Sequence, residues 1–426
     1  AASSAAAGRL HQIIHPMGTV DTFTYEYGAW QPNADPSVPG VFTPGTGFSL
    51  RVTATRGTTA SPTGIANRTL RLVSVFDEAG NEVFSARQVY TGADYATLDW
   101  RLMTYDGLRR PLSERRSSGE LTGTTWNCCA KASETLPDGT QYTYAYDALR
   151  RLVAKTRIGT GSQPDLVTSY TYDAAGRVVS ETLSGGSLST TSTRTYDLAG
   201  RLTASVDPHG LTTLYTYLPG VNTGSQRRGG ATTVTHPGGF TTITETFCDG
   251  QLASTTGNAQ VSQYYDCGVN ADGTRWMLQR SSGGDSPRWQ KITIGLLGHA
   301  LLVEKSGYGG TVATAHVYNA ASQLIRTERS GQADTLYEYD ALGVLFRSGL
   351  DADGDGVLTL ASNDQISEMN EEYLQDASDA WWQVQTQKIY AVAGSATATT
   401  VSTGRRRLSG FASGIVSESE SIDIHG

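Results

Sequence analysis

Aromatic and apolar residues stand two positions apart in many short stretches of this chain, and turn-forming residues follow them. The stretch SYTYDAAGRVVSE is the clearest example, because Tyr170 and Tyr172 would share one face of a strand. Asp173 and Gly176 then bracket a four-residue turn, since Asp favours the first position of a type I turn and Gly the fourth. The pattern predicts a β-hairpin in which the Arg177 guanidinium lies over the Tyr172 ring.

This Tyr-Asp-x-x-Gly-Arg element, which we call the repeat corner, returns at intervals of about 20 to 40 residues, a spacing typical of repeat proteins. Some copies are incomplete: Arg150 takes the place of the glycine in one, and Val344 takes the place of the arginine in another. The residues that define the four clearest copies are Tyr146, Asp147, Tyr172, Asp173, Gly176, Arg177, Tyr196, Asp197, Gly200, Arg201, Tyr339, Asp340 and Gly343.

A second turn of the form x-Pro-x-Gly alternates with the repeat corner. It occurs at residues 15–18, 136–139, 207–210 and 236–239. Proline presets φ for such a turn and glycine closes it. The chain therefore reads as turn, strand, turn, strand, which predicts a sheet built from hairpins laid side by side.

These motifs closely resemble the YD-repeat, or RHS-repeat, family. The family motif stands intact at residues 172–178 and 196–202, and the resemblance runs from about Phe76 to the C-terminus and weakly from His15. It implies an all-β fold: a spiralling antiparallel sheet of repeated hairpins, either part of a YD-repeat shell or an open solenoid-like segment. In bacterial RHS proteins, insecticidal toxin complexes and teneurins, such a sheet encloses a hollow shell.

The chain divides into three expected segments. Residues 1–66 form a polar lead, a hairpin and a Pro/Gly-rich region that is mostly loop from residue 29; residues 67–350 form the YD-repeat sheet; and residues 351–426 hold an acidic loop and further strands. A helical turn is expected at residues 370–379. Both ends of the sequence read as cut from a longer polypeptide, whose export signal would lie upstream.

Composition and charge narrow the classes of function. The chain has 426 residues and a net charge of −8, which argues against a general nucleic-acid binder. Its 48 glycines and 21 tyrosines favour strands and turns over helices. No apolar run is long enough to span a bilayer.

An acidic loop is the strongest candidate for a metal site. Asp351, Asp353 and Asp355 alternate before a glycine, as in the first half of an EF-hand calcium loop, and the backbone carbonyl of Val357 would be the next ligand. The bidentate Glu of that motif is missing, so Asp364, or Asn363 beside it, would complete a structural Ca²⁺ site. The alternative is a solvated acidic hairpin tip, because Asp-Gly is also a strong turn signal.

The four cysteines show no metal-binding spacing. Cys248 and Cys267 lie in successive strands, and a disulfide between them would suit an exported protein. The alternative is two buried free thiols. The adjacent Cys128 and Cys129 read as reduced thiols on opposite faces of a strand.

No catalytic signature is present, and the scattered histidines are best explained by turns and packing. Asp207-Pro208-His209-Gly210 resembles the element near which some RHS shells cleave themselves, but it reads as one of the x-Pro-x-Gly turns. Trp381 and Trp382 are expected to pack within strands rather than to bind a sugar.

The sequence thus predicts a non-enzymatic structural protein that is exported or displayed at the cell surface. The family resemblance implies a β-shell fragment that encloses a C-terminal effector, with neighbouring segments of the same larger chain as its partners. One alternative is a filament or surface layer, in which further copies join through open strand edges. Another is an adhesion or glycan-binding module that uses Tyr and Trp faces.

Overall fold

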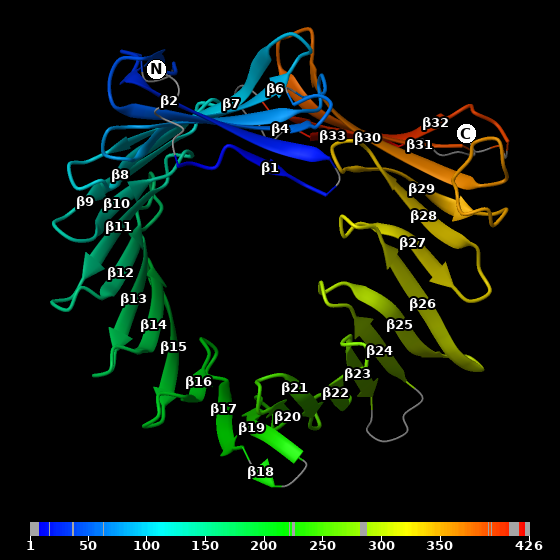
Figure 1. Cartoon of the computed structure of the whole chain (residues 1–426). Coiled ribbons are helices and arrows are strands. Elements are labelled where there is room, and N and C mark those ends of the chain that lie inside the picture. Colours follow the sequence, from blue (N-terminus) through cyan, green and yellow to red (C-terminus); the bar gives the residue numbers. More distant parts are fainter. Residues whose placement is uncertain are drawn as a thin grey trace. The chain divides into compact units, whose positions relative to one another are not determined.

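The structure is a computed structural model, and Figure 1 shows that it consists of strands and turns. No helix long and apolar enough to cross a membrane occurs among the described residues. The alternating residues 422–426, whose sequence predicts the start of a further strand, lie outside the described part. The described residues are 8–16, 18–35, 38–62, 64–220, 222–223, 226–281, 288–390, 392, 394–408 and 417–421.

The chain folds into two compact units that are interleaved in the sequence. Unit 1 contains residues 1–125, 135–139 and 317–426, and unit 2 contains residues 126–134 and 140–316. The chain therefore starts in unit 1, passes through unit 2 and returns to unit 1. These boundaries do not coincide with the segment limits at residues 66 and 350 expected from the sequence.

The first part of unit 1 is a set of antiparallel strands in chain order, in which the long strand β2 pairs with β1, β3 and β4. Its strands are β1 (Gln12–Ile14), β2 (Thr19–Gln31), β3 (Val41–Pro44), β4 (Ser49–Thr58), β5 (Leu70–Phe76), β6 (Glu82–Tyr90), β7 (Tyr95–Tyr105), β8 (Pro111–Arg116) and β9 (Leu121–Trp126). The region expected to be largely loop at residues 29–66 also contains the end of β2 and the strands β3 and β4. Its prolines fall in the connections or at the end of β3, where no ladder N–H is required.

The second part of unit 1 contains β27 (Leu324–Arg329), β28 (Asp334–Tyr339), β29 (Leu345–Asp351), β30 (Gln365–Gln375), β31 (Trp381–Ile389), β32 (Thr399–Arg407) and β33 (Ser417–Ser421). β30 and β31 pair over nine residues, from Ser367 with Ile389 to Gln375 with Trp381. The helical turn expected at residues 370–379 was therefore wrong, since most of it belongs to β30. β30 and β31 are among the further strands expected in residues 351–426.

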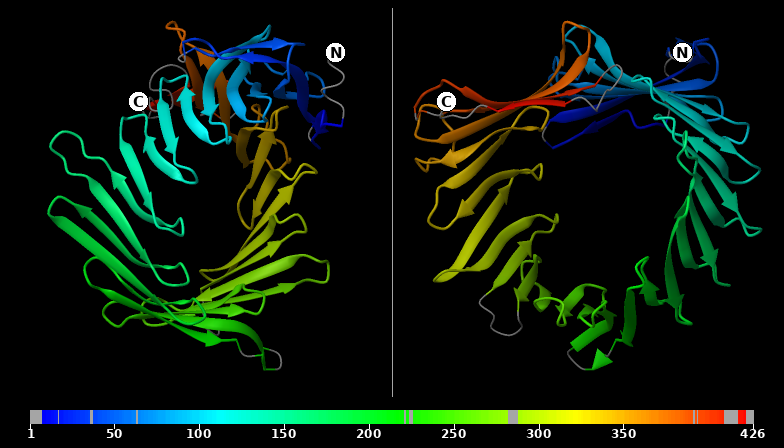
Figure 2. Two further views of the ribbon diagram at one scale, coloured as in Figure 1. Left: turned by 90° about the vertical axis from the view of Figure 1, so that its left-hand side faces the viewer. Right: turned by 180° about the vertical axis from the view of Figure 1, so that it is seen from behind.

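Unit 2 continues the same construction, and Figure 2 shows its hairpins side by side from two further directions. Each strand pairs antiparallel with the next along the chain, with one exception. β17 pairs with β19, and the short β18, which lies between them in the sequence, also pairs with β19. The strands are β10 (Lys131–Thr135), β11 (Gln141–Tyr146), β12 (Leu152–Arg157), β13 (Leu166–Tyr172), β14 (Val178–Gly185), β15 (Leu188–Tyr196), β16 (Leu202–Val206), β17 (Thr212–Pro219), β18 (Asn222–Thr223), β19 (Gln226–Thr235), β20 (Thr241–Phe247), β21 (Leu252–Thr256), β22 (Gln263–Val269), β23 (Arg275–Ser281), β24 (Trp289–Ile294), β25 (Ala300–Gly307) and β26 (Gly310–Tyr318).

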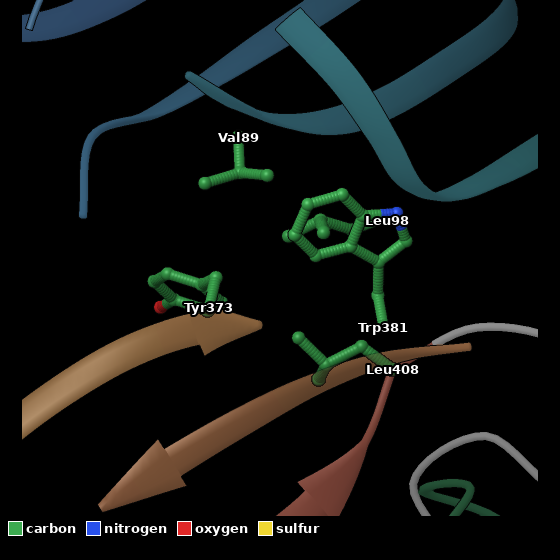
Figure 3. Close-up of a cluster of buried hydrophobic side chains, with 5 residues drawn as sticks. All are labelled: Val89, Leu98, Tyr373, Trp381 and Leu408. Atoms are coloured by element: carbon green, nitrogen blue, oxygen red, sulfur yellow. The ribbon is translucent and has the colours of Figure 1, made fainter. Parts of the chain in front are cut away.

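The main buried cluster of unit 1 joins its two sequence parts, and we call this contact the seam. Val89 and Leu98 from β6 and β7 meet Tyr373, Trp381 and Leu408 from the C-terminal strands (Figure 3). All five side chains are at most 9% exposed. Full burial of a large apolar side chain stabilises a fold by about 1.5–3 kcal/mol, so the seam is a substantial source of unit 1 stability.

Candidate functional site

The repeat corner is built by one aspartate that organises its own turn. In the copy at residues 172–178, the Gly176 N–H donates to the Asp173 carbonyl at 3.0 Å, and Gly176 has a φ of 82°. One carboxylate oxygen of Asp173 accepts the N–H groups of Ala175 and Arg177 at 2.9 Å, and the other accepts Arg177 Nε at 2.7 Å. Asp and Gly therefore occupy the two turn positions predicted from the sequence.

The same contacts recur in the other copies. The Arg151 N–H and Nε donate to Asp147 at 2.9 and 2.7 Å, and the Arg201 N–H and Nε donate to Asp197 at 2.9 and 2.8 Å. In the copy that lacks the glycine, Arg150 adopts a φ of 64°, the conformation that glycine has elsewhere. The corner turn thus keeps its backbone conformation when arginine replaces the glycine.

The corners headed by Tyr146 and Tyr172 each contact the next corner along the sheet. The Arg177 guanidinium lies 4.7 Å from the centre of the Tyr196 ring, and Arg177 Nη1 donates to the Asp197 carbonyl at 3.3 Å. In return, the Tyr196 hydroxyl donates to the Val178 carbonyl at 3.0 Å. The prediction that Arg177 lies over Tyr172 was therefore wrong, because the arginine reaches forward to the following copy.

This lateral contact is periodic, and we call the row the corner ladder. Arg151 lies 4.7 Å from the Tyr172 ring, and Arg201 lies 4.7 Å from the Tyr217 ring. The hydroxyl of Tyr172 donates to the Leu152 carbonyl at 2.5 Å, and that of Tyr217 donates to the Leu202 carbonyl at 2.8 Å. Arginine suits this place because its planar fork stacks on an aromatic ring while it still donates hydrogen bonds.

A β-bulge aims each corner tyrosine. The ladder register shifts by one residue immediately before Tyr146, Tyr172, Tyr196 and Tyr339. A bulge bends its strand and re-aims the side chain at that position. The tyrosine consequently meets the preceding copy rather than the arginine of its own turn.

The corner also fixes the charge of its aspartate. The backbone N–H of Arg177 and then its guanidinium lower the pKa of Asp173 below the usual value for aspartate. The same N–H contact, from Arg151 and from Arg201, lowers the pKa of Asp147 and of Asp197. Hydrogen bonds to a carboxylate favour its charged form, so these turns favour ionised aspartates.

The degenerate corner at Asp340 takes its arginine from another part of unit 1. Val344 stands at the arginine position, and Arg68 Nη2 lies 2.5 Å from Asp340 Oδ2. The contact is an ion pair rather than a well-aligned hydrogen bond, since Oδ2 has no hydrogen-bond donor among the described residues. Beside it, the Tyr373 N–H donates to the Asn67 carbonyl at 2.8 Å, so the ion pair belongs to the seam.

One corner escaped the sequence pattern altogether. Asp376 accepts the N–H groups of Ser378 and Ala380 at 2.8 and 3.0 Å, as the other corner aspartates accept theirs. Asp379 takes the glycine position with a φ of 60°, and Trp382 Nε1 donates to Asp376 at 2.7 Å where arginine donates elsewhere. The absence of both Tyr and Gly hid this copy.

The acidic loop brings together part of the predicted metal site. Among the described residues, carboxylate oxygens of Asp351, Asp353 and Asp364 lie within 4.8 Å of one another, and Asp355 is not in this group. Asp355 instead accepts the N–H of Val357 at 2.8 Å. The loop therefore collects three of the four predicted carboxylates.

Backbone N–H groups hold the two buried carboxylates of this loop. Asp351 accepts from Gly354 and Gly356 at 2.8 and 2.9 Å, and Asp364 accepts from Ala352 and Thr359, both at 2.9 Å. Each oxygen keeps a further lone pair, so the set of oxygen donors fits a hard cation such as Ca²⁺.

The negative charges of neighbouring aspartates change the pKa of Asp353 in this loop. The N–H of Asp355 acts to lower the pKa of Asp353, but desolvation and the charges of Asp355, Asp364 and Asp351 outweigh it and raise that pKa. A bound cation would relieve this repulsion. The geometry is thus consistent with the predicted cation site, in which Asp351, Asp353 and Asp364 would be the ligands.

The remaining candidate side chains are the four cysteines and the tryptophan pair. Cys248 and Cys267 are exposed free thiols, so they match neither the expected disulfide nor two buried thiols. Cys128 and Cys129 are exposed, in the turn after β9 rather than within a strand. Trp381 and Trp382 are each 7% exposed, which confirms packing within the strands.

The Asp207 sequence is a turn, as predicted. The Gly210 N–H donates to the Asp207 carbonyl at 3.0 Å, and an Asp207 carboxylate oxygen accepts the N–H groups of His209 and Leu211, both at 2.9 Å. The aspartate thus serves its own turn, as the corner aspartates do.

Comparison with known proteins finds a matching family for part of the chain. Residues 132–163 match the family described as RHS Repeat. No curated protein matches the sequence.

Solved structures similar to this chain come from toxin complexes. The crystal structure of TcdB2-TccC3 has 11% identity and a TM-score of 0.45, covering 93% of this chain and 26% of that chain. A structure of the Photorhabdus luminescens Tc holotoxin pore has 10% identity and a TM-score of 0.35, covering 94% of this chain and 27% of that chain. The chain spans about a quarter of the length of these proteins. The RHS Repeat match at residues 132–163 and the corners that recur beyond it support the interpretation of the chain as an RHS-repeat, or YD-repeat, protein.

Proposed function

We propose that this chain is a non-enzymatic wall segment of a larger exported or cell-surface β-shell, which would enclose an effector. The observation that carries the proposal is the corner ladder. Corner arginines, tyrosines and aspartates bind one another or the adjoining backbone, as in the contacts of Arg177 with Asp173, Tyr196 and the Asp197 carbonyl. Side chains used in this way stabilise a wall and leave little free chemistry at the corner.

The seam adds support for a shell over an open ribbon. Strands from the first 125 residues and from the last 110 residues bury Leu98 and Trp381 against one another in unit 1. An end-to-end filament would instead need open strand edges at which further copies pair. β33 offers the sequence Ser-Glu-Ser-Glu-Ser, and charged residues on an edge strand oppose such pairing.

The glycan-binding alternative loses its strongest candidate residues. Trp381 packs in the seam, and the Trp382 indole donates to Asp376 while the Arg405 guanidinium lies 4.8 Å from its ring centre. Neither ring is free to stack on a sugar.

We propose in addition that the acidic loop of Asp351, Asp353 and Asp364 holds a structural Ca²⁺. Such an ion would fix the connection between β29 and β30, where Leu358 is buried against Leu336 and Ile366.

Electron cryo-microscopy of the full polypeptide to which this chain belongs tests the wall proposal. The expected result is a hollow particle in which these residues line a lumen that contains further protein. Solid fibres, or separate globular domains with no enclosed volume, would contradict it. Protease treatment provides a second reading, since an enclosed effector is cleaved only after the shell has been opened.

A further inference from the structure

A polar pocket of about 510 Å³ lies beside the seam, entirely within unit 1. Strands β6, β7 and β8 and the turn after β8 form one side, and β32 forms the other. Leu408 links the two features, because it lines the pocket and also packs in the seam shown in Figure 3. Any ligand in this pocket would contact parts of the chain that are about 300 residues apart in the sequence.

The lining of the pocket carries an excess of positive charge. Five arginines face two acidic residues, Asp99 and Glu120. At neutral pH arginine is always charged, so the lining has a net charge of +3, from five positive and two negative groups. The arginines are Arg87, Arg101, Arg116, Arg406 and Arg407.

The arginines on the N-terminal side have carboxylate partners. Arg87 pairs with Asp99, and Arg101 pairs with Glu82 from outside the lining. Arg116 Nε lies 2.9 Å from Glu114. These three charges are therefore largely compensated within the sheet.

The two arginines of β32 differ from them. Arg406 donates to the neutral amide oxygen of Gln383 at 2.7 Å. Arg407 Nε is buried, and among the described residues it has no hydrogen-bond partner. A buried donor without a partner is unfavourable by about 1–3 kcal/mol, and more when it is charged. Within the described part of the chain, the pocket thus presents two guanidinium groups without a carboxylate and one buried N–H without an acceptor.

We propose that this pocket binds a tetrahedral oxyanion, a phosphate or sulfate group, between β32 and the β6–β8 side of the seam. Such a group offers several acceptor oxygens to the fork of guanidinium donors, and it neutralises the excess charge. The hydroxyls of Ser117 and Ser118 in the same lining are further donors of the right kind. The anion is either free or carried as an ester on a larger molecule, and both have the same recognition chemistry.

Binding here would strengthen the seam, since one anion contacts both of its sides. A ligand that binds only the folded state raises stability in proportion to the logarithm of its concentration above its dissociation constant. The proposal is independent of whether the chain forms a shell, because it requires only the folded unit 1.

The test uses the whole chain with inorganic phosphate and glucose 6-phosphate as probes, and chloride at matched ionic strength as the reference. We expect saturable binding of one anion by calorimetry and a higher melting temperature than in chloride. Tighter binding of glucose 6-phosphate than of phosphate indicates an esterified ligand, whereas equal or weaker binding indicates a free anion. Equal melting temperatures in phosphate and chloride, with no saturable heat, would overturn the proposal.

Variants distinguish binding in the pocket from non-specific attraction of anions to surface arginines. Arg407→Gln should weaken binding at least about tenfold, the effect of losing one charge-assisted contact of about 1.4 kcal/mol. Arg115→Gln is the matched control, since Arg115 is next to Arg116 in β8, does not line the pocket, and should change affinity less than about twofold. Circular dichroism checks folding. If Arg407→Gln does not fold, Arg406→Gln decides the matter, because Arg406 is the other arginine of β32 in the lining and its contact with Gln383 is exposed. Unchanged affinity in the folded pocket variant would contradict the site.

Discussion

The substituted arginine at Asp340 offers the sharpest test of how the corners work. Arg68 pairs there with Asp340, in place of the arginine that Val344 has replaced. Removal of Arg68 should therefore destabilise unit 1, and Val344→Arg should restore the loss by rebuilding the usual corner. The backbone at this copy already matches the others, since the Asp340 N–H donates to the Val344 carbonyl at 2.9 Å.

The expected magnitude follows from burial and from the remaining contacts. The side chains of Arg68 and Asp340 are 21% and 12% exposed, and breaking a buried pair at one partner can cost about 3–5 kcal/mol. Asp340 keeps the N–H groups of Leu342 and Val344 at 2.8 and 2.9 Å, so its charge is not left without partners. We therefore expect Arg68→Ala to lower the free energy of unfolding by about 2 kcal/mol, which is less than the full cost of breaking a buried ion pair because those two N–H contacts remain.

The assay is urea unfolding followed by tryptophan fluorescence, which reports on Trp381 in the seam together with the six other tryptophans. Arg329→Ala is the control, because Arg329 is exposed and donates only to Gln332 among the described residues; it should change stability by less than about 0.5 kcal/mol. In the Arg68→Ala background, Val344→Arg should recover at least half of the lost stability. The reasoning would be refuted if Val344→Arg stabilised the chain equally with and without Arg68. It would also be refuted if Arg68→Ala lowered the free energy of unfolding no more than Arg329→Ala does.

Three other predictions concern the corner turn and the acidic loop. Gly176→Ala should destabilise by about 1–2 kcal/mol in urea unfolding, because a side chain at a φ of 82° is strained even in open space; Gly107→Ala, in an equally open turn without positive φ, should not. The free energy of unfolding should fall as the pH drops below about 4, because the pKa of Asp173 is lower in the folded state than in the unfolded state. The stabilisation that Asp173 provides is present above its unfolded pKa and is lost as the pH falls through its folded pKa. Asp173→Asn should flatten that acid dependence in pH-dependent melting, and an unchanged profile would contradict it. Finally, Ca²⁺ should raise the melting temperature over that in chelator, and Asp353→Asn should abolish the difference; no shift in the parent chain would count against the cation site.

The turns could be predicted from the sequence because their causes are local. An aspartate that caps its own turn and a glycine that allows positive φ act within five residues, as Asp173 and Gly176 do. The carboxylates of the acidic loop could be grouped for the same reason, apart from Asp355, whose role in an Asx turn with Val357 depends on the course of the loop.

The partners of the corner side chains could not be predicted because they depend on sheet pairing. The ring over which Arg177 lies is set by a bulge at Tyr196 and by the spacing between copies, neither of which appears in a single motif. Arg68 is 272 residues from Asp340, and nothing near it in the sequence indicates that contact. The strand at residues 370–375 lacked the aromatic alternation of the repeats, and ladder pairing with β31 decided its conformation.

A double-mutant cycle between Arg177 and Tyr196 tests most directly the claim that corners bind their neighbours laterally. Arg177→Ala and Tyr196→Leu should show a coupling energy of at least about 0.5–1 kcal/mol, since the cation–π contact is partly buried, whereas Arg177→Ala and Tyr172→Leu should be additive. Coupling of Arg177 with Tyr172, or additivity with Tyr196, would contradict the corner ladder.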